Sequence, residues 1–175
     1  MAYTLDQLAK ENLAKVWEDD KGKHAVIYLE EGDIDCSCQG LTTLDISKHK
    51  KGNINCCNNE LVSLDLYNHV SGNVDCANNQ LVFLNLHNFQ KGYLNCPNNQ
   101  LTSLDLSNHK SGYVICCYNK LRSADLGRHE DGDVDFNRNY LTSLNLDNMK
   151  NGNVFCSNNK LTSLNLRKHK RYRNC

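Results

Sequence analysis

Apolar and polar residues alternate along this chain in a pattern that repeats every 20 residues from residue 32 to residue 169. Each copy contains a segment whose common form is Gly-x-Val-x-Cys, followed by Leu-x-x-Leu-x-Leu, and residues 74–86 show the pattern clearly. Alternation of this kind predicts two short strands in each copy. Self-similarity at a fixed short period indicates a solenoid in which each copy forms one coil.

The seven copies align into columns, so like residues are expected to lie above one another. Stacked strands lie about 4.8 Å apart, and each column then forms a straight ladder. In the column that begins with Asn59, we expect an inward amide to bond the backbone groups of the turn. In the column that begins with Gly32, glycine is expected to supply a positive φ or a close backbone approach.

Two columns invite a reading as metal or disulfide chemistry. Cysteine recurs from Cys36 onward, but Phe136 occupies the same slot, so apolar packing is the favoured interpretation. A line of thiols also cannot provide the tetrahedron that zinc requires. The column of His49 contains Phe89 and Met149, so we expect its rings to pack against the turn, with metal binding as the alternative. Two cysteines beside the ladder, Cys57 and Cys117, are predicted to be exposed free thiols.

A column of Asp and Asn separates the leucines and is expected to face solvent, with Asn relieving the repulsion between stacked carboxylates. Calcium binding by these carboxylates is the alternative. The column consists of Asp45, Asp65, Asn85, Asp105, Asp125, Asn145 and Asn165.

The half-coil with Val74, Cys76, Asn79 and Leu81 resembles the end of the leucine-rich repeat, L-x-x-L-x-L-x-x-N-x-L. The resemblance covers residues 32–169 and implies a solenoid that serves as a scaffold for protein–protein interaction. The first leucine of that half is replaced, as by Lys51, and 20 residues leave little room for a helix. We therefore expect a mostly β protein: a right-handed β-solenoid of about seven coils with two short parallel strands each.

The non-repeating residues 1–31 are expected to cap the first coil. A helix is predicted from Thr4 to Trp17, with a capping box between Thr4 and Gln7. A polar turn at residues 18–23 and a strand at residues 25–29 follow. The alternative is a helix that binds a partner. The predicted organisation is thus a cap (1–31), a solenoid (32–169) and a basic tail (170–175).

Composition is compatible with this fold. The chain is 39% hydrophobic with a mean hydropathy of −0.63, which suits coils that need only a thin apolar filling. There is no run of about 18 apolar residues and no secretory signal pattern at residues 1–6, so neither a membrane span nor secretion is expected. Ten cysteines in such a chain indicate a reducing cytoplasm. Export into a host cell is equally compatible with these features.

Charge is unevenly distributed, although the net charge is zero. Residues 1–66 are acidic and residues 67–175 are basic, with a basic cluster at residues 167–173. Because no basic stripe follows the coils, we do not expect nucleic acid to be the partner. No cap follows Leu166, so an open last coil could associate with a second copy. End-to-end assembly of a structural protein is therefore the alternative function.

Enzyme activity is not expected, because ladders place like residues beside like on an open surface and no phosphate loop or catalytic motif is present. No cofactor and no metal are expected. The residues that interrupt the columns are the candidate site. They are expected on the outward face of the Val/Cys strands, and they are Tyr93, Tyr113, Ile115, Tyr118, Arg138 and Phe155. Tyr and Arg are typical anchors of interfaces, so this patch predicts a site for another protein, with scattered surface aromatics as the alternative.

Overall fold

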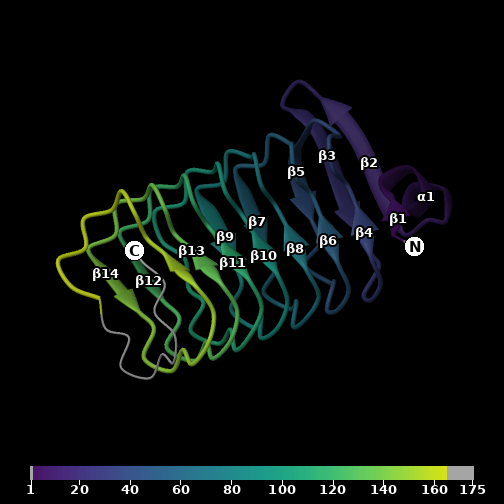
Figure 1. Cartoon of the computed structure of the whole chain (residues 1–175). Helices are drawn as coiled ribbons and strands as arrows, with labels where there is room; N and C mark the ends of the chain where they lie inside the picture. The colour runs from purple at the N-terminus through teal and green to yellow at the C-terminus, as the bar shows by residue number, and fades with distance from the viewer. Residues whose placement is uncertain (1, 165–175) are drawn as a thin grey trace.

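A computed structural model describes residues 2–164 of the chain, which form one elongated β-solenoid (Figure 1). The described part is mostly β structure with one short helix, and its 20-residue coils stack in parallel. The predicted fold class is therefore confirmed. The N-terminal segment lies at one end of the stack and the last described coil lies at the other (Figure 1).

The Gly-x-Val-x-Cys segments form one parallel sheet along the whole stack. Each strand pairs with the equivalent residues of the next coil, as Ile34 pairs with Ile54 and Ile54 with Val74. The strands in order are β1 (Tyr3–Thr4), β4 (Ile34–Asp35), β6 (Ile54–Asn55), β8 (Val74–Asp75), β10 (Leu94–Asn95), β11 (Val114–Ile115), β13 (Val134–Asp135) and β15 (Val154–Phe155).

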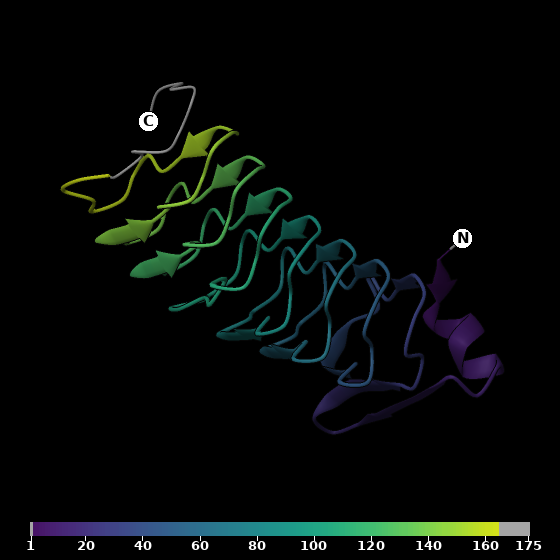
Figure 2. The ribbon, with the colours of Figure 1, turned by 90° about the horizontal axis from the view of Figure 1, so that it is seen from below.

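The Leu-x-x-Leu-x-Leu segments form the opposite side, and Figure 2 shows the two rows of strands facing each other. This side is divided into three small sheets, with orders β2-β3-β5, β7-β9 and β12-β14. Its coil strands are β5 (Leu41–Asp45), β7 (Ser63–Asp65), β9 (Phe83–Asn85), β12 (Ser123–Asp125) and β14 (Ser143–Asn145). The coil containing Leu104 forms only a bridge, from Asp105 to Asp125.

The apolar columns of the two sides fill the space between the sheets. The cysteines of the ladder are buried, and Cys36, Cys56, Cys76, Cys96 and Cys116 are fully enclosed. Phe136 is equally buried in the same column. The inward orientation predicted for this column is confirmed. Because cysteine and phenylalanine are both buried there, the position requires an apolar side chain rather than a thiol.

The asparagine ladder connects neighbouring coils, as predicted. The Asn79 carbonyl accepts the Leu61 N–H of the preceding coil at 3.0 Å, while its amide donates to the carbonyls of Cys56 and Cys76 at 3.0 and 3.1 Å. These backbone groups are buried and cannot reach water. Each asparagine therefore supplies the hydrogen bonds that water would otherwise make, both in its own coil and in the preceding one.

Glycine is required where successive coils approach most closely. Gly72 has a φ of +119°, and a Cβ atom there would lie 2.0 Å from the Gly52 carbonyl oxygen. Both expected reasons for the glycine column, positive φ and close approach, are therefore confirmed.

The N-terminal segment differs from its prediction. The helix α1 covers only Leu5–Lys10, with the predicted Thr4/Gln7 capping box at its start. The helix expected up to Trp17 is wrong, because Asn12 adopts a φ of +58° and the chain continues as β2 (Ala14–Asp19). This strand forms an antiparallel hairpin with β3 (Gly22–Ile27), so the polar residues 18–23 include the end of one strand and the start of the next.

The hairpin and the first residues extend both sheets by pairing with the first coil. β1 pairs with β4, and β3 pairs in parallel with β5. Within residues 2–164, the six-residue helix is too short to cross a membrane. The end of the predicted solenoid (165–169), the basic tail and the expected open C-terminal edge lie outside the described residues.

Candidate functional site

A shallow groove of about 640 Å³ lies on the outer face of the eight-stranded sheet. It crosses five consecutive coils, because its lining residues occupy equivalent positions 20 residues apart. The lining consists of Asn73, Tyr93, Tyr113, Ile115, Asp133, Asp135 and Phe155. Four of the six candidate residues thus line one groove.

The apolar wall of the groove combines two tyrosines with an aliphatic and an aromatic side chain. The rings of Tyr93 and Tyr113 meet edge to face, with centroids 6.3 Å apart and planes at 81°. Burial raises the pKa of the Tyr93 hydroxyl, and the Asp75 carboxylate adds to this shift. Tyr113 is 54% exposed and Phe155 is 40% exposed, so both can contact a ligand.

Two carboxylates interrupt this wall, and the sequence analysis did not single them out. Asp135 pairs in register with Ile115 on one side and with Phe155 on the other. Its carboxylate accepts the N–H of Asn137 at 2.9 Å, and Asp133 accepts the N–H of Asn153 at 2.8 Å. Neither carboxylate forms an ion pair with any of residues 2–164.

The tyrosines also expose backbone donors. In the earlier coils, each side chain of this column accepts the N–H of its successor, as Asn53 accepts from Asn73 at 2.8 Å and Asn73 from Tyr93 at 3.0 Å. A tyrosine side chain has no acceptor at that point. The N–H groups of Tyr113 and Asp133 therefore lack the side-chain acceptor that their counterparts have.

The other two candidate residues lie outside the groove. Tyr118 and Arg138 occupy the left-handed position of the turn after the strand, with φ values of 55° and 56°. The Arg138 guanidinium lies over the Tyr118 ring at 5.0 Å, a cation–π contact within the chain. The structure thus separates this pair from the four residues of the groove.

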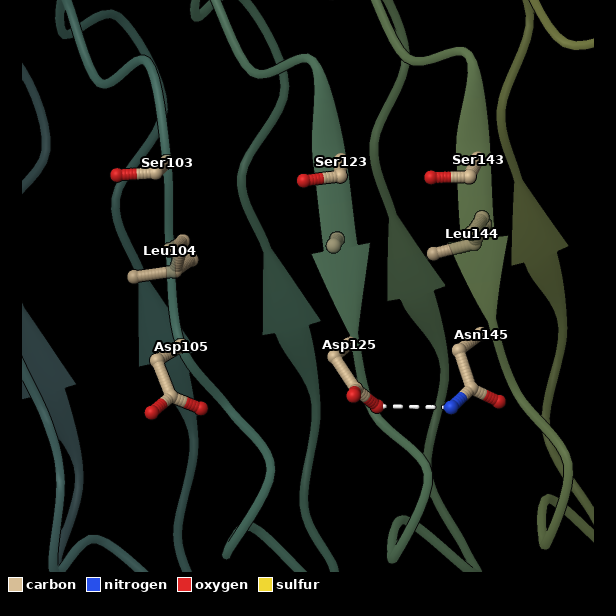
Figure 3. Close-up of a pocket in the computed structure, with 9 residues that line it drawn as sticks. Ser103, Leu104, Asp105, Ser123, Asp125, Ser143, Leu144 and Asn145 are labelled. Atoms are coloured by element: carbon tan, nitrogen blue, oxygen red, sulfur yellow. Dashed lines mark hydrogen bonds between the residues drawn. The ribbon is translucent and has the colours of Figure 1, made fainter.

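A second groove, of about 510 Å³, lies on the opposite side (Figure 3). Leu104, Ala124 and Leu144 line it, and Ala124 takes the place of the column leucine there. Ser103, Ser123 and Ser143 form a row of hydroxyls along one edge, and Asp105, Asp125 and Asn145 form a row along the other (Figure 3).

The Asp/Asn column of this second groove behaves as predicted. The Asn145 amide donates to Asp125 at 2.9 Å, as the Asn85 amide does to Asp65, so the interspersed Asn relieves repulsion between carboxylates. In residues 2–164, no group of three or more His, Cys, Asp or Glu side chains is arranged to hold a metal ion. This groove is polar and supplies few apolar anchors.

The sequence analysis missed an apolar cluster on the same side as the second groove, formed by Val62, Val82 and Phe83. Each is about half exposed, and the N–H of Val82 donates to the carbonyl of Val62 in the preceding coil. They replace the Thr or Ser of other copies, so the column comparison that identified the tyrosines could also have found them.

The histidine column forms a buried stack of rings. The ring centroids of His49 and His69 are 5.2 Å apart, those of His69 and Phe89 are 5.7 Å apart, and the stack continues through His109 and His129. His49 Nε2 lies 2.8 Å from the Gly32 carbonyl oxygen. The predicted packing of these rings against the turn is confirmed.

The buried cysteines of the ladder are poor nucleophiles in this fold. Burial raises the pKa of Cys36 to about 12, and burial also raises the pKa values of Cys56, Cys76, Cys96 and Cys116, so these thiols stay protonated. Cys57 and Cys117 are free, as predicted, but they are partly buried rather than exposed. The exposed free thiol of the described chain is Cys38.

Comparison of the chain with protein-family models, curated proteins and solved structures finds no match. The resemblance to leucine-rich repeats therefore depends on the repeat residues alone.

Proposed function

We propose that this protein is a non-enzymatic scaffold of leucine-rich-repeat type, which binds another protein through the groove on the eight-stranded sheet. The observation that carries the proposal is the clustering of Tyr93, Tyr113, Ile115 and Phe155 in one groove of an otherwise polar face. Aromatic side chains in such a patch supply much of the energy of protein interfaces, and an exposed apolar patch on a repeat protein favours a partner site.

The rigidity of the coil stack supports this role. The strands under the groove are held by the parallel ladder, and the turn beside them is held by asparagines such as Asn99 and Asn119. A partner that docks on strands already fixed in place loses little ordering entropy from the scaffold, so more of the contact energy appears as affinity.

The chemistry of the groove supports binding rather than catalysis. Its lining contains no cysteine, histidine or serine, and its two carboxylates, Asp133 and Asp135, lie in a shallow open groove rather than in an enclosed pocket. The free thiols of the described chain are compatible with a reducing compartment, which supports the proposal of a cytoplasmic protein.

The test is affinity capture from the source cell with purified full-length protein. Proteins retained by the wild type are expected to be lost with the double variant Tyr93→Ser/Tyr113→Ser. The matched control is Tyr67→Ser, a half-exposed tyrosine on the opposite side of the solenoid. Circular dichroism checks that all three proteins are folded.

The proposal is supported if the groove variant loses the captured proteins and the Tyr67→Ser control retains them. Equal capture by the wild type and the groove variant would overturn it.

A further inference from the structure

We propose that the groove binds a basic peptide segment of its partner, with an arginine held between Asp133 and Asp135. This inference rests on the proposed function and adds the chemistry of the ligand. Four observations carry it: the charge of the outward strand positions, the position of the two carboxylates, the side chains beside them and the length of the groove.

The two outward strand columns of the eight-stranded sheet contain acids but no bases. Its outward positions are the residue before each coil strand and the last residue of that strand, beginning with Asp33 and Asp35, and none of them is Lys or Arg in any coil. The acids there are Asp33, Asp35, Asp75, Asp133 and Asp135. A cationic ligand therefore meets attraction along these two columns. The adjacent column of isolated bridges is mixed, with Lys51 and Lys91 as well as Glu31 and Asp131.

Asp133 directly precedes β13 and Asp135 ends it, so the two flank Val134 and point to the same face, with Cα atoms about 6.6 Å apart. Both line the groove, and no cation of residues 2–164 neutralises either of them. Asp135 accepts the Asn137 N–H, and Asp133 accepts both the N–H and the side-chain amide of Asn153. These bonds hold the carboxylates in position and leave further lone pairs open to a ligand.

The neighbours of these carboxylates favour a guanidinium over an ammonium group. Asp135 lies between Ile115 and Phe155, and the column of Asp133 continues to Tyr113 in the preceding coil. A planar guanidinium can form two hydrogen bonds to one carboxylate and stack on an adjacent ring, whereas an ammonium group is a compact and strongly hydrated charge. The apolar neighbours also lower the local dielectric, which strengthens the pairing.

The groove is longer than a single amino acid. It crosses five coils, which at about 4.8 Å per step corresponds to roughly 19 Å, the length of about six extended residues. An arginine at Asp133 and Asp135 leaves the tyrosine end for an apolar side chain of the same peptide. The N–H groups of Tyr113 and Asp133 are donors available for its backbone carbonyls.

The experiment selects ligands from a display library of random heptapeptides on purified full-length protein. Selected peptides are then synthesised with a fluorescent label, and their affinities are measured by fluorescence polarisation. We expect arginine to be enriched at one position. Replacing that arginine by lysine should weaken binding several-fold, and replacing it by glutamine should weaken binding at least tenfold.

The decisive variant is Asp133→Asn/Asp135→Asn, which keeps the acceptors for Asn137 and Asn153 and removes both charges. Asparagine occupies these columns in other coils, for example at Asn53 and Asn55, so the fold tolerates it. The matched control is Asp33→Asn/Asp35→Asn, the same pair of positions in the first coil, outside the groove. Affinity should fall at least tenfold in the groove variant and less than twofold in the control.

The outcomes separate the two proposals. Peptides that bind only while Tyr113 is present, yet carry no enriched arginine and ignore the loss of Asp133 and Asp135, overturn the arginine site and leave the scaffold function intact. Peptides whose binding is unchanged by both Tyr113→Ser and the charge variant overturn both proposals. An equal loss of affinity in the first-coil control would show a general charge effect and would also overturn the arginine site.

Discussion

The asparagine ladder shows how a single residue type can stabilise a turn that has no solvent. One Asn79 side chain serves an N–H of the preceding coil and carbonyls of both coils, all of them buried. A carboxylate lacks the donors, a hydroxyl is too short, and glutamine carries the same amide on a side chain that is one methylene longer.

Replacing Asn79 by alanine is expected to destabilise the protein by about 3 kcal/mol or more, because several buried backbone groups lose their partner at once. Urea unfolding measures the change in free energy. The control is Asn68→Ala, an exposed amide that donates only to the Ser47 carbonyl, with an expected loss below about 1 kcal/mol. Similar losses in both variants would contradict the role of the ladder.

Substitutions at two glycines with positive φ can distinguish the cost of backbone strain from the cost of a steric clash. At Gly92 an added Cβ would lie 2.1 Å from the Gly72 carbonyl oxygen, whereas at Gly40 no atom lies within 4 Å. Gly40→Ala should cost about 1–2 kcal/mol for the left-handed backbone alone. Gly92→Ala should cost at least about 2 kcal/mol more, because neighbouring coils must separate. Thermal denaturation of the two variants compares them, and equal melting temperatures would contradict the clash.

At the scale of elements, the buried ring stack combines packing with proton binding. The Nδ1 atoms of His49 and His69 are 3.2 Å apart, and those of His109 and His129 are 3.1 Å apart, so one ring of each pair donates to the other. His49 Nε2 can donate to Gly32, which makes His69 the donor within its pair. His69 Nε2 is then bare, in agreement with its lack of a hydrogen-bond partner among the described residues.

This stack predicts a loss of stability in mild acid. Burial, with a smaller contribution from the neighbouring histidine, lowers the pKa values of His69 and His109 to about 4. The unfolded chain therefore binds protons at a higher pH than the folded chain. The stabilisation is complete above about pH 6.5 and is lost as the pH falls towards 4, by up to about 3 kcal/mol for each of these histidines.

The variant His109→Phe/His129→Phe tests this dependence, since Phe89 already occupies the same column. The free energy of unfolding in urea, measured from pH 7 to pH 4, should fall less steeply in the variant than in the wild type. Carboxylates contribute equally to both proteins, so parallel curves would show that these histidines do not titrate as inferred.

Predictions from the sequence were more accurate for the repeated columns than for the N-terminal segment, which occurs only once. Columns with seven examples revealed the sheet, the inward cysteines and the role of glycine, because the repeat averages out local exceptions. The segment from Leu13 to Trp17 has no second copy, and its apolar spacing fits both a helix and the observed hairpin. Tertiary pairing of β2 with β3 decided between them, and a sequence pattern cannot show that pairing.

The candidate site was predictable where residues break a column. Tyr93, Tyr113, Ile115 and Phe155 differ from the Asn and Asp of their columns and could be found in this way. Asp133 and Asp135 are ordinary members of the same columns, so only the structure shows that they lie among the aromatic residues. The sequence pattern grouped Tyr118 with the outward strand residues, whereas it lies at the left-handed position of the following turn. Both kinds of position are mostly polar in the other copies, so the pattern does not distinguish them.

At the scale of the whole molecule, the reactivity of the cysteines shows whether neighbouring coils stay packed against each other. Among the cysteines of residues 2–164, iodoacetamide is expected to label Cys38 first. Cys57 and Cys117 should follow more slowly, because they are partly buried and burial raises their pKa values. The six buried ladder cysteines should react only after unfolding. Peptide mass spectrometry locates the label, and early modification of Cys76 or Cys96 would show that neighbouring coils separate in the native state.

The asparagine contacts also give the stack a direction. Leu61 receives its partner from Asn79, and Leu81 receives its partner from Asn99, so each turn is completed by residues that come later in the chain. On a ribosome, the newest coil would always wait for its successor to emerge before its backbone is satisfied. Synthesis and folding of this protein would then advance together, with folding one coil behind.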